Sequence, residues 1–583
     1  MINPDKILFI PSLRQGNGTG HLKRCLDWAS GFKEVHIYLL DCETEKSIDM
    51  QNHPIFKTVG NLIYHDAVTD SEGDHWELII LDNRLTSDLP IQFKGVPVLA
   101  IDEAGDLRKS ASYILDILPS SLKELPNLQE FSFFNGPKSI RPDRKLKKIL
   151  ISFGGEDPCN LSTKILQSLD MKLLSRFDWY VILPEKNKSV NSTPLEVHCL
   201  DYADNLKDQL MHYDFVITSY GLTAVESLCS RVPVLLFNPG KYHDKLSRLS
   251  KIPYCPKAYK KVNSQINHVL SEALMTQMTN NQTPWVKLWE KYTQKSAPFM
   301  EWIQSMTISA EDCPICGSSH RKSIGRFPQR SYFLCRDCSM KYMVQFRQKK
   351  DIYKKDYFFS DYKAQYGKTY LEDFPHIRKM ASERLGRIRI KSGSLLDIGC
   401  AYGPFLLEAI QKGFSSWGLE ISEDAVSYVR EHYPEIRIHQ DAFENIPSEN
   451  PIFDKEQFDV ITLWYVIEHF DDLSSLLTKV NYFLKKGGIL ALSTPHASGI
   501  SGIFNLSGFL ENSPEDHFTL WDRRSARKAL RMYGFHTIKF HVTGHHPERF
   551  PDRLKRVLPL TLRKYISLLF GWGDTFEIYA VKG

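Results

Sequence analysis

The chain has 583 residues, of which 42% are hydrophobic and 25% are charged, and its formal net charge is +5. This composition excludes a largely disordered chain, and the length predicts about three to five folding units. The small charge and the lack of a long Lys/Arg run do not indicate nucleic acid as a partner. No stretch reaches the ~18 apolar residues of a membrane span and the first residues do not resemble a secretory signal, so we expect a cytoplasmic protein.

Two series of short apolar segments alternate with helical patterns in the first half. Segments such as "KILFIPS" and "ELIILD" belong to the first series, which ends near Ser120, and "KILISFGGEDP" opens the second series after the linker "GPKSIRPDRK". This alternation predicts two α/β domains, each with a parallel sheet. A ligand site is expected in the cleft between them, because clefts between domains are preferred binding places.

Two strand-to-helix junctions in the second series are rich in small residues. One contains Gly154 and Gly155, and the other, "TSYGLTAVESL", contains Gly221, Thr223 and Glu226. Free backbone N–H groups at the start of a helix favour a diphosphate, and Glu226 is placed one turn further on to bind ribose hydroxyls. The alternative is a pair of turn glycines with Thr223 as the helix N-cap.

The stretch "GNGTGHLKRC" follows the first apolar segment and opens a helix. Together with "IILDN", "LAIDEAGD" and "SYGLTAVESLCSRVPVLLF", it makes residues 1 to about 290 resemble the GT-B superfamily, and most closely the nucleotide-sugar hydrolases of pseudaminic acid biosynthesis. The resemblance implies a UDP-sugar site in which Gly18, Gly20 and Asp82 contact the substrate. It also implies that His21 is catalytic and acts on the attacking water; the alternative is that His21 caps the helix.

Two positions depart from that hydrolase family. Arg84 stands where the family usually has an aromatic residue, and "NPGKYHDKLSRL" stands where it has an Asn-Gln pair. In the family these positions face the sugar and the attacking water. Two alternatives therefore stay open for this half: a GT-B glycosyltransferase, in which an acceptor hydroxyl replaces water, and a module that binds a nucleotide sugar without turning it over.

Four of the eleven cysteines form a cluster that divides the chain. Cys313, Cys316, Cys335 and Cys338 follow the spacing C-x2-C-x18-C-x2-C, which is typical of a zinc ribbon. Four thiolates complete a tetrahedral shell and leave no position for water, so we expect this Zn²⁺ to be structural. The alternative is two chance pairs of buried thiols.

Strand and helix patterns alternate again after this cluster, in segments such as "SLLDIGCAYGPFLLEAI" and "FDVITLWYVIEH". They predict a doubly wound parallel sheet. We expect the acidic residue that ends the second strand to take both ribose hydroxyls of an adenosine, the one that ends the third to accept from its amino group, and the glycines of the first turn to admit the ligand to the backbone. The candidate residues are Asp397, Gly399, Gly403, Glu420 and Asp441.

From about residue 310 to its end the chain resembles class I S-adenosylmethionine-dependent methyltransferases that carry an N-terminal zinc ribbon, several of which methylate nucleotide-linked sugars. "YKAQYGKTYLED" and "PEDHFTLWDRRSARKALRMYGF" match the same group, while an NAD enzyme is the rival interpretation. His469 and His517 are candidates for the base that deprotonates the acceptor, and the alternative is that both are structural. The insertion between Thr543 and Asp574 either covers a sheet edge or makes weak peripheral contact with a membrane.

These patterns predict an α/β protein with a two-domain GT-B-like module, a zinc ribbon and a Rossmann-like class I methyltransferase domain. We expect a bifunctional enzyme of glycan biosynthesis, in which a UDP-sugar hydrolase or transferase is fused to a methyltransferase that acts on a sugar or nucleotide sugar. The expected domains are a GT-B N-terminal domain in 1–135, a nucleotide-binding domain in 136–308, the ribbon in 309–350 and the methyltransferase in 351–583.

Overall fold

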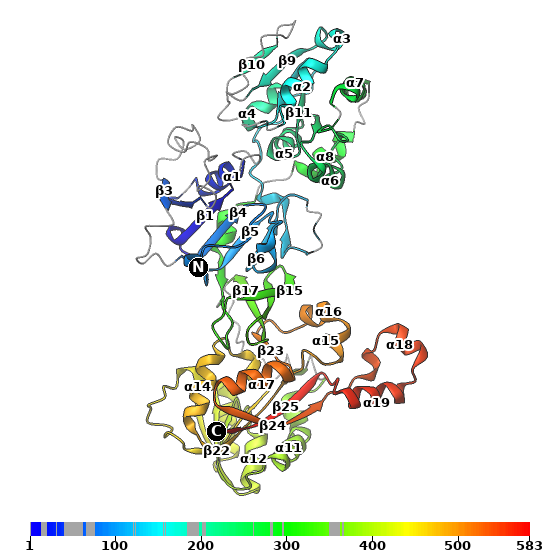
Figure 1. Ribbon diagram of the computed structural model, residues 1–583. Coiled ribbons are helices and arrows are strands. Elements are labelled where there is room, and N and C mark those ends of the chain that lie inside the picture. Colours follow the sequence, from blue (N-terminus) through cyan, green and yellow to red (C-terminus); the bar gives the residue numbers. More distant parts are fainter. Residues whose placement is uncertain are drawn as a thin grey trace. The chain divides into compact units, whose positions relative to one another are not determined.

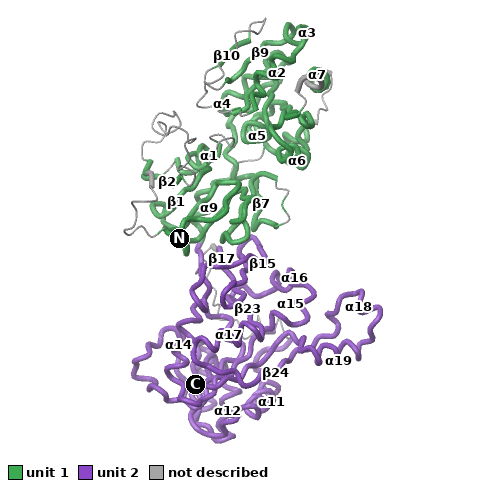
Figure 2. Tube along the Cα trace, in the orientation of Figure 1, with its two compact units in different colours: residues 1–306 green, residues 307–583 purple. Residues whose placement is uncertain are grey.

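The computed structural model divides into two compact units, residues 1–306 and 307–583 (Figure 2). Two of the candidate residues, Gly18 and Gly155, lie outside the part of the chain that the structure describes. The described part is the whole chain apart from residues 1, 13–19, 31, 40–61, 66–75, 120–121, 123, 155–156, 158, 184–196, 201–205, 261, 280–283, 294–296, 310, 349–361 and 364–366.

The first sheet of unit 1 has seven parallel strands in the order β3-β2-β1-β4-β5-β6-β7 (Figure 1). All residues of β1 and β4 are buried, as expected for central strands of a parallel sheet that is covered on both faces. The strands are β1 (Ile7–Pro11), β2 (Val35–Tyr38), β3 (Leu62–His65), β4 (Leu78–Asp82), β5 (Val98–Ile101), β6 (Tyr113–Asp116) and β7 (Leu128–Gln129), and helix α1 (Gly20–Ala29) follows β1.

The second sheet of unit 1 has six parallel strands in the order β10-β9-β8-β11-β12-β13. The prediction of two parallel sheets in the first half is therefore confirmed. Its strands are β8 (Lys148–Ser152), β9 (Asp178–Ile182), β10 (His198–Leu200), β11 (Phe215–Thr218), β12 (Val234–Phe237) and β13 (Tyr254–Cys255). Its helices are α2 (Leu161–Ser168), α3 (Met171–Leu174), α4 (Leu206–Gln209), α5 (Leu222–Cys229), α6 (Lys241–Ser250), α7 (Val262–Thr279), α8 (Pro284–Tyr292) and α9 (Phe299–Gln304), the last of which packs on α1 of the first sheet.

A small sheet in unit 2 carries the four clustered cysteines. Its strands β15, β16 and β17 pair antiparallel, and β23 pairs antiparallel with β17. The turn with Cys313 and Cys316 precedes β15, and the turn with Cys335 and Cys338 connects β16 to β17. The two cysteine pairs therefore meet at one end of the sheet. The strands are β14 (Met306–Ile308), β15 (Arg321–Phe327), β16 (Arg330–Cys335), β17 (Lys341–Gln348) and β23 (Thr519–Leu520).

The large sheet of unit 2 has seven strands in the order β20-β19-β18-β21-β22-β25-β24. The prediction of a wholly parallel sheet is wrong for the last two strands: β25 pairs antiparallel with both β22 and β24. No crossover over the sheet lies between β24 and β25, so the returning chain runs antiparallel. The strands are β18 (Gly393–Ile398), β19 (Phe414–Glu420), β20 (Arg437–Gln440), β21 (Phe458–Trp464), β22 (Leu484–Pro495), β24 (Phe535–Thr543) and β25 (Thr575–Lys582).

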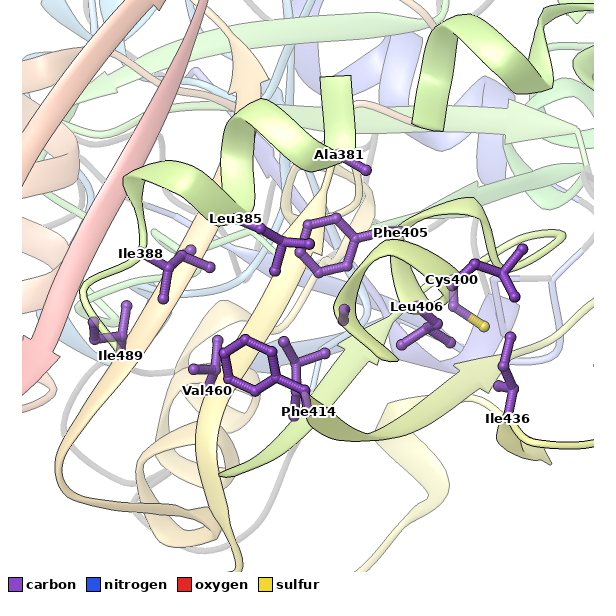
Figure 3. Close-up of a cluster of buried hydrophobic side chains, with 14 of the residues drawn as sticks. Ala381, Leu385, Ile388, Cys400, Phe405, Leu406, Phe414, Ile436, Val460 and Ile489 are labelled. Carbon is purple, nitrogen blue, oxygen red and sulfur yellow. The ribbon is translucent and has the colours of Figure 1, made fainter. Parts of the chain in front are cut away.

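Helices cover this sheet and bury its apolar side chains. In Figure 3, Ala381, Leu385 and Ile388 from the α11 region pack with Phe405 and Val460. The cluster fixes the strands whose ends carry the candidate cofactor residues. The helices of unit 2 are α11 (Tyr370–Arg387), α12 (Pro404–Gln411), α13 (Glu423–His432), α14 (Leu473–Phe483), α15 (Ile500–Phe504), α16 (Leu506–Glu511), α17 (Arg523–Met532), α18 (Asp552–Val557) and α19 (Leu560–Phe570).

The insertion between β24 and β25 forms a hairpin of α18 and α19. This hairpin extends away from the sheet in Figures 1 and 2 rather than lying over its edge. The interpretation of the insertion as a cover for the sheet edge is therefore wrong. Within the described residues, no helix is long and apolar enough to cross a membrane.

Candidate functional site

Acidic side chains lie at the ends of neighbouring strands of the large sheet in unit 2. Asp397 is the next-to-last residue of β18, Glu420 is the last residue of β19, and Asp441 directly follows β20. The first two are buried. Because the carboxyl ends of parallel strands meet at one edge of the sheet, this edge is where the fold places a ligand.

Hydrogen bonds orient Glu420 firmly. The N–H groups of Ala401, Ile421 and Ser422 donate to its carboxylate at 2.9, 2.9 and 3.0 Å, while burial raises its pKa. A carboxylate has about four acceptor positions, so this arrangement leaves about one for a ligand hydroxyl. The expectation that Glu420 takes both ribose hydroxyls therefore requires one of the backbone bonds to be given up.

Thr462 on the adjacent strand β21 holds the side chain of Asp397. The Thr462 hydroxyl donates to Asp397 Oδ1 at 2.6 Å, and burial raises the pKa of Asp397 to about 7. Asp441 is engaged locally, since it accepts from the Ala442 N–H at 2.8 Å and from the Asn445 amide at 2.9 Å. Both carboxylates are thus oriented before any ligand is bound.

The two glycines of the first turn have a structural requirement of their own. Gly399 has φ +72° and Gly403 has φ +77°, a region that residues with a Cβ rarely adopt. A Cβ on Gly399 would lie 2.6 Å from Val466, and one on Gly403 would lie 3.1 Å from Ile436. The structure therefore accounts for both glycines by backbone conformation and packing, and close approach of a ligand to them stays a prediction.

The two candidate base histidines lie together. The rings of His469, in the short 3₁₀ turn Ile467–His469 after β21, and His517 have centroids 4.7 Å apart. Asp516 Oδ2 lies 3.1 Å from His469 Nδ1, and the Phe518 N–H donates to the Glu468 carbonyl at 2.8 Å. The sequence pointed to the two histidines as candidates, but not to the neighbouring carboxylates of Glu468 and Asp516.

We call Glu468, His469, Asp516 and His517 the His469 cluster. Burial and neighbouring charges shift the pKa values of its members in different directions. Burial opposes charge on His469, but the hydrogen bond to Asp516 and the negative charge of Glu468 raise its pKa. Burial and the nearby charge of His469 lower the pKa of His517 to about 3. Burial raises the pKa of Glu468 to about 7. One ligand atom from each of Glu468, His469 and His517 also lies within 4.8 Å of the others, so the group could hold a divalent metal.

The four clustered cysteines meet as the sequence predicted. All four sulfur atoms lie within 4.8 Å of one another, with 3.4 Å between Cys313 Sγ and Cys338 Sγ and 3.6 Å between Cys316 Sγ and Cys335 Sγ. The Gly317 N–H donates to the Cys313 carbonyl at 2.9 Å, which closes the first turn. No disulfide joins these described thiols, and the S₄ set fits a tetrahedral Zn²⁺.

A second cluster of charged side chains lies at the carboxyl edge of the first sheet in unit 1. His21 Nδ1 and Asp82 Oδ1 are 2.6 Å apart. Arg24 donates to both oxygens of Asp82 at 2.7 and 2.6 Å and to Asp102 at 2.8 Å. Burial opposes the charge of Asp82, but Arg24 and His21 hold its pKa well below the ordinary value. His21 is therefore oriented by a buried carboxylate and does not cap its helix.

The predicted junctions of the second sheet are open at their glycines. A Cβ built on Gly154 or on Gly221 meets no atom within 4 Å, so the backbone is accessible there. Gly221, and not Thr223, is the N-cap of α5, which corrects the capping interpretation; Thr223 lies within the first turn. Glu226 is buried, and burial raises its pKa.

Gly20, the residue before His21, lies where α1 contacts α5. A Cβ on Gly20 would lie 2.8 Å from Leu222 Cδ1, and Lys207 Nζ of α4 lies 2.6 Å from Asp27 Oδ2 of α1. The start of α1 is thus next to the start of α5. Close packing against Leu222 therefore accounts for the glycine at position 20.

Comparison with known proteins identifies one part of the chain. Residues 374–539 match the family model described as a methyltransferase domain. The ubiquinone biosynthesis O-methyltransferase of Klebsiella pneumoniae is 26% identical over 141 residues, which is 23% of this chain and 58% of that protein. The protein of the same name from Glaesserella parasuis is 30% identical over 131 residues, 21% of this chain and 56% of that protein.

Other similarities are broader or more distant. An uncharacterized protein of Methanocaldococcus jannaschii is 29% identical over 280 residues, 40% of this chain and 57% of that protein. A geranyl diphosphate C-methyltransferase from Streptomyces coelicolor is 16% identical, with a TM-score of 0.28 over 38% of this chain and 85% of that chain. A methyltransferase from Archaeoglobus fulgidus has 17% identity and a TM-score of 0.28, over 36% and 99%.

Unit 2 therefore contains a class I methyltransferase domain with a Rossmann-like sheet, of the kind that uses S-adenosylmethionine. The chain spans little more than half the length of the curated relatives named above.

Proposed function

We propose that unit 2 transfers a methyl group from S-adenosylmethionine to a sugar or a nucleotide sugar. The observation that carries the proposal is the set of oriented carboxylates at consecutive strand ends of the methyltransferase sheet, with the His469 cluster following the next strand. Within this proposal we assign Glu420 to the ribose and Asp441 to the adenine of the cofactor. The sugar acceptor rests on the resemblance to zinc-ribbon methyltransferases described above.

His469 is the residue that we assign to proton removal. Methyl transfer to a hydroxyl forms a bond between the acceptor oxygen and the methyl carbon, breaks the bond from that carbon to sulfur, and releases the hydroxyl proton. His469 can take this proton when neutral, and Asp516 stabilises the imidazolium that forms. His517, which is neutral at pH 7, keeps one face of the site uncharged.

The pH dependence of methyl transfer tests this assignment. Because Asp516 and Glu468 raise the pKa of His469, we expect kcat/KM to rise with pH on the alkaline side of 6.5, the ordinary pKa of histidine. Asp516→Asn removes a negative charge, lowers the pKa of His469 and shifts the rising limb to lower pH. The measurement is a pH profile of both proteins. An unmoved limb in the variant would show that another group takes the proton.

Glu420→Ala tests the cofactor site. We expect the change to weaken S-adenosylmethionine binding by about 2–3 kcal/mol, as for the loss of charge-assisted hydrogen bonds, which is about 30- to 150-fold in Kd. Equilibrium dialysis with labelled S-adenosylmethionine measures the effect. Glu423→Ala, an exposed change three residues further on, is the matched control and should leave Kd unchanged. Equal affinity of Glu420→Ala and wild type would refute the assignment.

The reaction itself is tested with a labelled methyl group. The full chain is mixed with methyl-labelled S-adenosylmethionine and a panel of UDP-sugars and free sugars, and the products are analysed by mass. The proposal expects one acceptor to gain the label while an equal amount of S-adenosylhomocysteine forms. Label that appears only on a protein or a quinone precursor would contradict the proposed acceptor class.

A second function is favoured by the pairing of His21 with the buried carboxylate of Asp82. We propose that unit 1 binds a UDP-sugar and cleaves its anomeric C–O bond, with Gly154, Gly221 and the start of α5 at the diphosphate. With Nδ1 held by Asp82, the Nε2 atom of His21 is left to accept the proton of the attacking oxygen. That oxygen comes from water in a hydrolase and from a sugar hydroxyl in a glycosyltransferase. A module that only binds the nucleotide sugar would show UDP affinity without turnover.

The proposal also includes a structural Zn²⁺ at the four cysteines and a cytoplasmic location. All ten described cysteines are free thiols, as in a reducing compartment. The four-domain division predicted from the sequence remains part of this proposal.

A further inference from the structure

The hairpin of α18 and α19 exposes an unusual amount of apolar surface. Seven large apolar side chains within 14 consecutive residues are 42–71% exposed. Single exposed apolar residues are ordinary, but a group of this size marks an interaction surface. The seven, which we call the apolar patch, are Val557, Leu560, Leu562, Tyr565, Leu568, Leu569 and Phe570.

The helical register puts three members of this patch on one side of α19. Leu562, Tyr565 and Leu569 follow one another at spacings of three and four residues, so they share one face. Ser567 lies on the opposite face, is fully buried, and forms a hydrogen bond of 2.8 Å with His545. The helix is therefore attached to the domain on the side of Ser567, while the face that carries Leu562, Tyr565 and Leu569 is exposed.

Contacts at the base of the hairpin hold it in place, and of the apolar patch Phe570 takes part in them, with its ring centroid 5.1 Å from that of Trp572. The buried ring of Phe550 packs against Phe504 and Trp572, with centroids 5.6 and 6.1 Å apart. Arg563 of α19 donates to the Pro547 carbonyl at 2.7 Å. Changes at the exposed Leu562 and Leu569 should therefore leave the fold intact.

The same hairpin is strongly basic. Residues 552–570 contain five Lys/Arg and a single acidic residue. Arg553, Arg556 and Lys564 are exposed, and none of the three has an ion-pair partner in the described part of the chain. Lys555 pairs with Asp552 at 3.1 Å. Positive charge beside exposed leucines complements a partner that has a negatively charged surface layer over an apolar interior.

We propose that this hairpin docks unit 2 on the surface of an anionic lipid bilayer, with the apolar patch in the acyl boundary and the basic side chains at the headgroups. A helix of eleven residues is about 16 Å long, which is too short to cross an apolar layer of ~30 Å. It therefore lies in the plane of the interface. The charge of the hairpin favours anionic lipid over a second copy of the chain, whose own hairpin would repel it.

The test is sedimentation of the full chain with vesicles of phosphatidylcholine mixed with an equal amount of phosphatidylglycerol. We expect binding to these vesicles, weaker binding to pure phosphatidylcholine, and release by salt. The double variant Leu562→Ser, Leu569→Ser should weaken binding about tenfold for each leucine. The double variant Arg556→Gln, Lys564→Gln should weaken it about fivefold for each charge.

Matched controls use exposed residues of unit 2 outside the hairpin. The pair Ile503→Ser, Met532→Ser removes two exposed apolar side chains, and the pair Arg430→Gln, Lys486→Gln removes two exposed charges; both should bind like wild type. The proposal is overturned if wild type stays in the supernatant, or if hairpin and control variants bind equally. It is also overturned if light scattering shows a dimer that the leucine variant dissociates while no vesicles are bound.

Discussion

Changing Cys335 to Ser is expected to reduce the zinc content from about one ion per chain to none. Three remaining thiolates no longer complete the tetrahedral shell, and a structural site of this kind contributes roughly 10–16 kcal/mol of apparent binding free energy. The antiparallel sheet β15–β17 should then unfold. Metal analysis and thermal unfolding of protein purified without chelators measure both effects.

Loss of the zinc should also destabilise the methyltransferase domain, because the turns that carry the cysteines contact this domain within unit 2. The Tyr533 hydroxyl donates to the Ile315 carbonyl at 2.5 Å, and the Ser474 N–H donates to the Pro314 carbonyl at 3.0 Å. Cys199→Ser, which changes an exposed free thiol, is the control and should keep both the zinc and the thermal midpoint. Wild-type protein without zinc would end the structural-metal hypothesis.

His21→Ala is expected to reduce UDP release by about 10²- to 10⁴-fold, the usual range for loss of a positioned base, while UDP affinity stays nearly unchanged. The reason is that His21, at the start of α1, is paired with Asp82 of β4, whereas the diphosphate is assigned to the start of α5. The measurement is UDP release with and without sugar acceptors. Release without an acceptor indicates a hydrolase, and release that needs an acceptor indicates a glycosyltransferase.

The reciprocal variant is Glu226→Ala. Ribose contacts act alike in the ground state and the transition state, so this change should raise the Kd for UDP and spare much of kcat. Thermal midpoints of both variants check that unit 1 remains folded. Full UDP release by His21→Ala would mean that the loop before α1 is only a structural turn.

Local sequence patterns predicted the parts of the sites that depend on a strand end or on a fixed spacing. The four cysteines meet because two short turns present them, and C-x2-C spacing is visible without any tertiary information. Glu420 ends its strand as expected, because the apolar run before it marks the strand and the parallel topology fixes the edge. His469 lies in the short turn that follows β21 for the same reason.

Residues that depend on long-range packing could not be predicted in this way. Arg24 lies on α1, while Asp82 ends β4 and Asp102 follows β5, about 60 and 80 residues further along the chain, so no local pattern joins them. Asp516 reaches His469 from a loop after α16. The direction of β25 and the outward course of α18 and α19 were also missed, because an amphipathic pattern does not specify what a helix packs against.

The central claim is that the strand-end carboxylates of unit 2 bind S-adenosylmethionine, and calorimetric titration of the full chain with this cofactor and, separately, with NAD tests it most directly. The same fold class also serves nicotinamide cofactors, so the two ligands discriminate between the methyltransferase and its rival. We expect about one S-adenosylmethionine per chain, displaced by S-adenosylhomocysteine, and no heat from NAD. Binding of NAD without binding of S-adenosylmethionine would contradict the account.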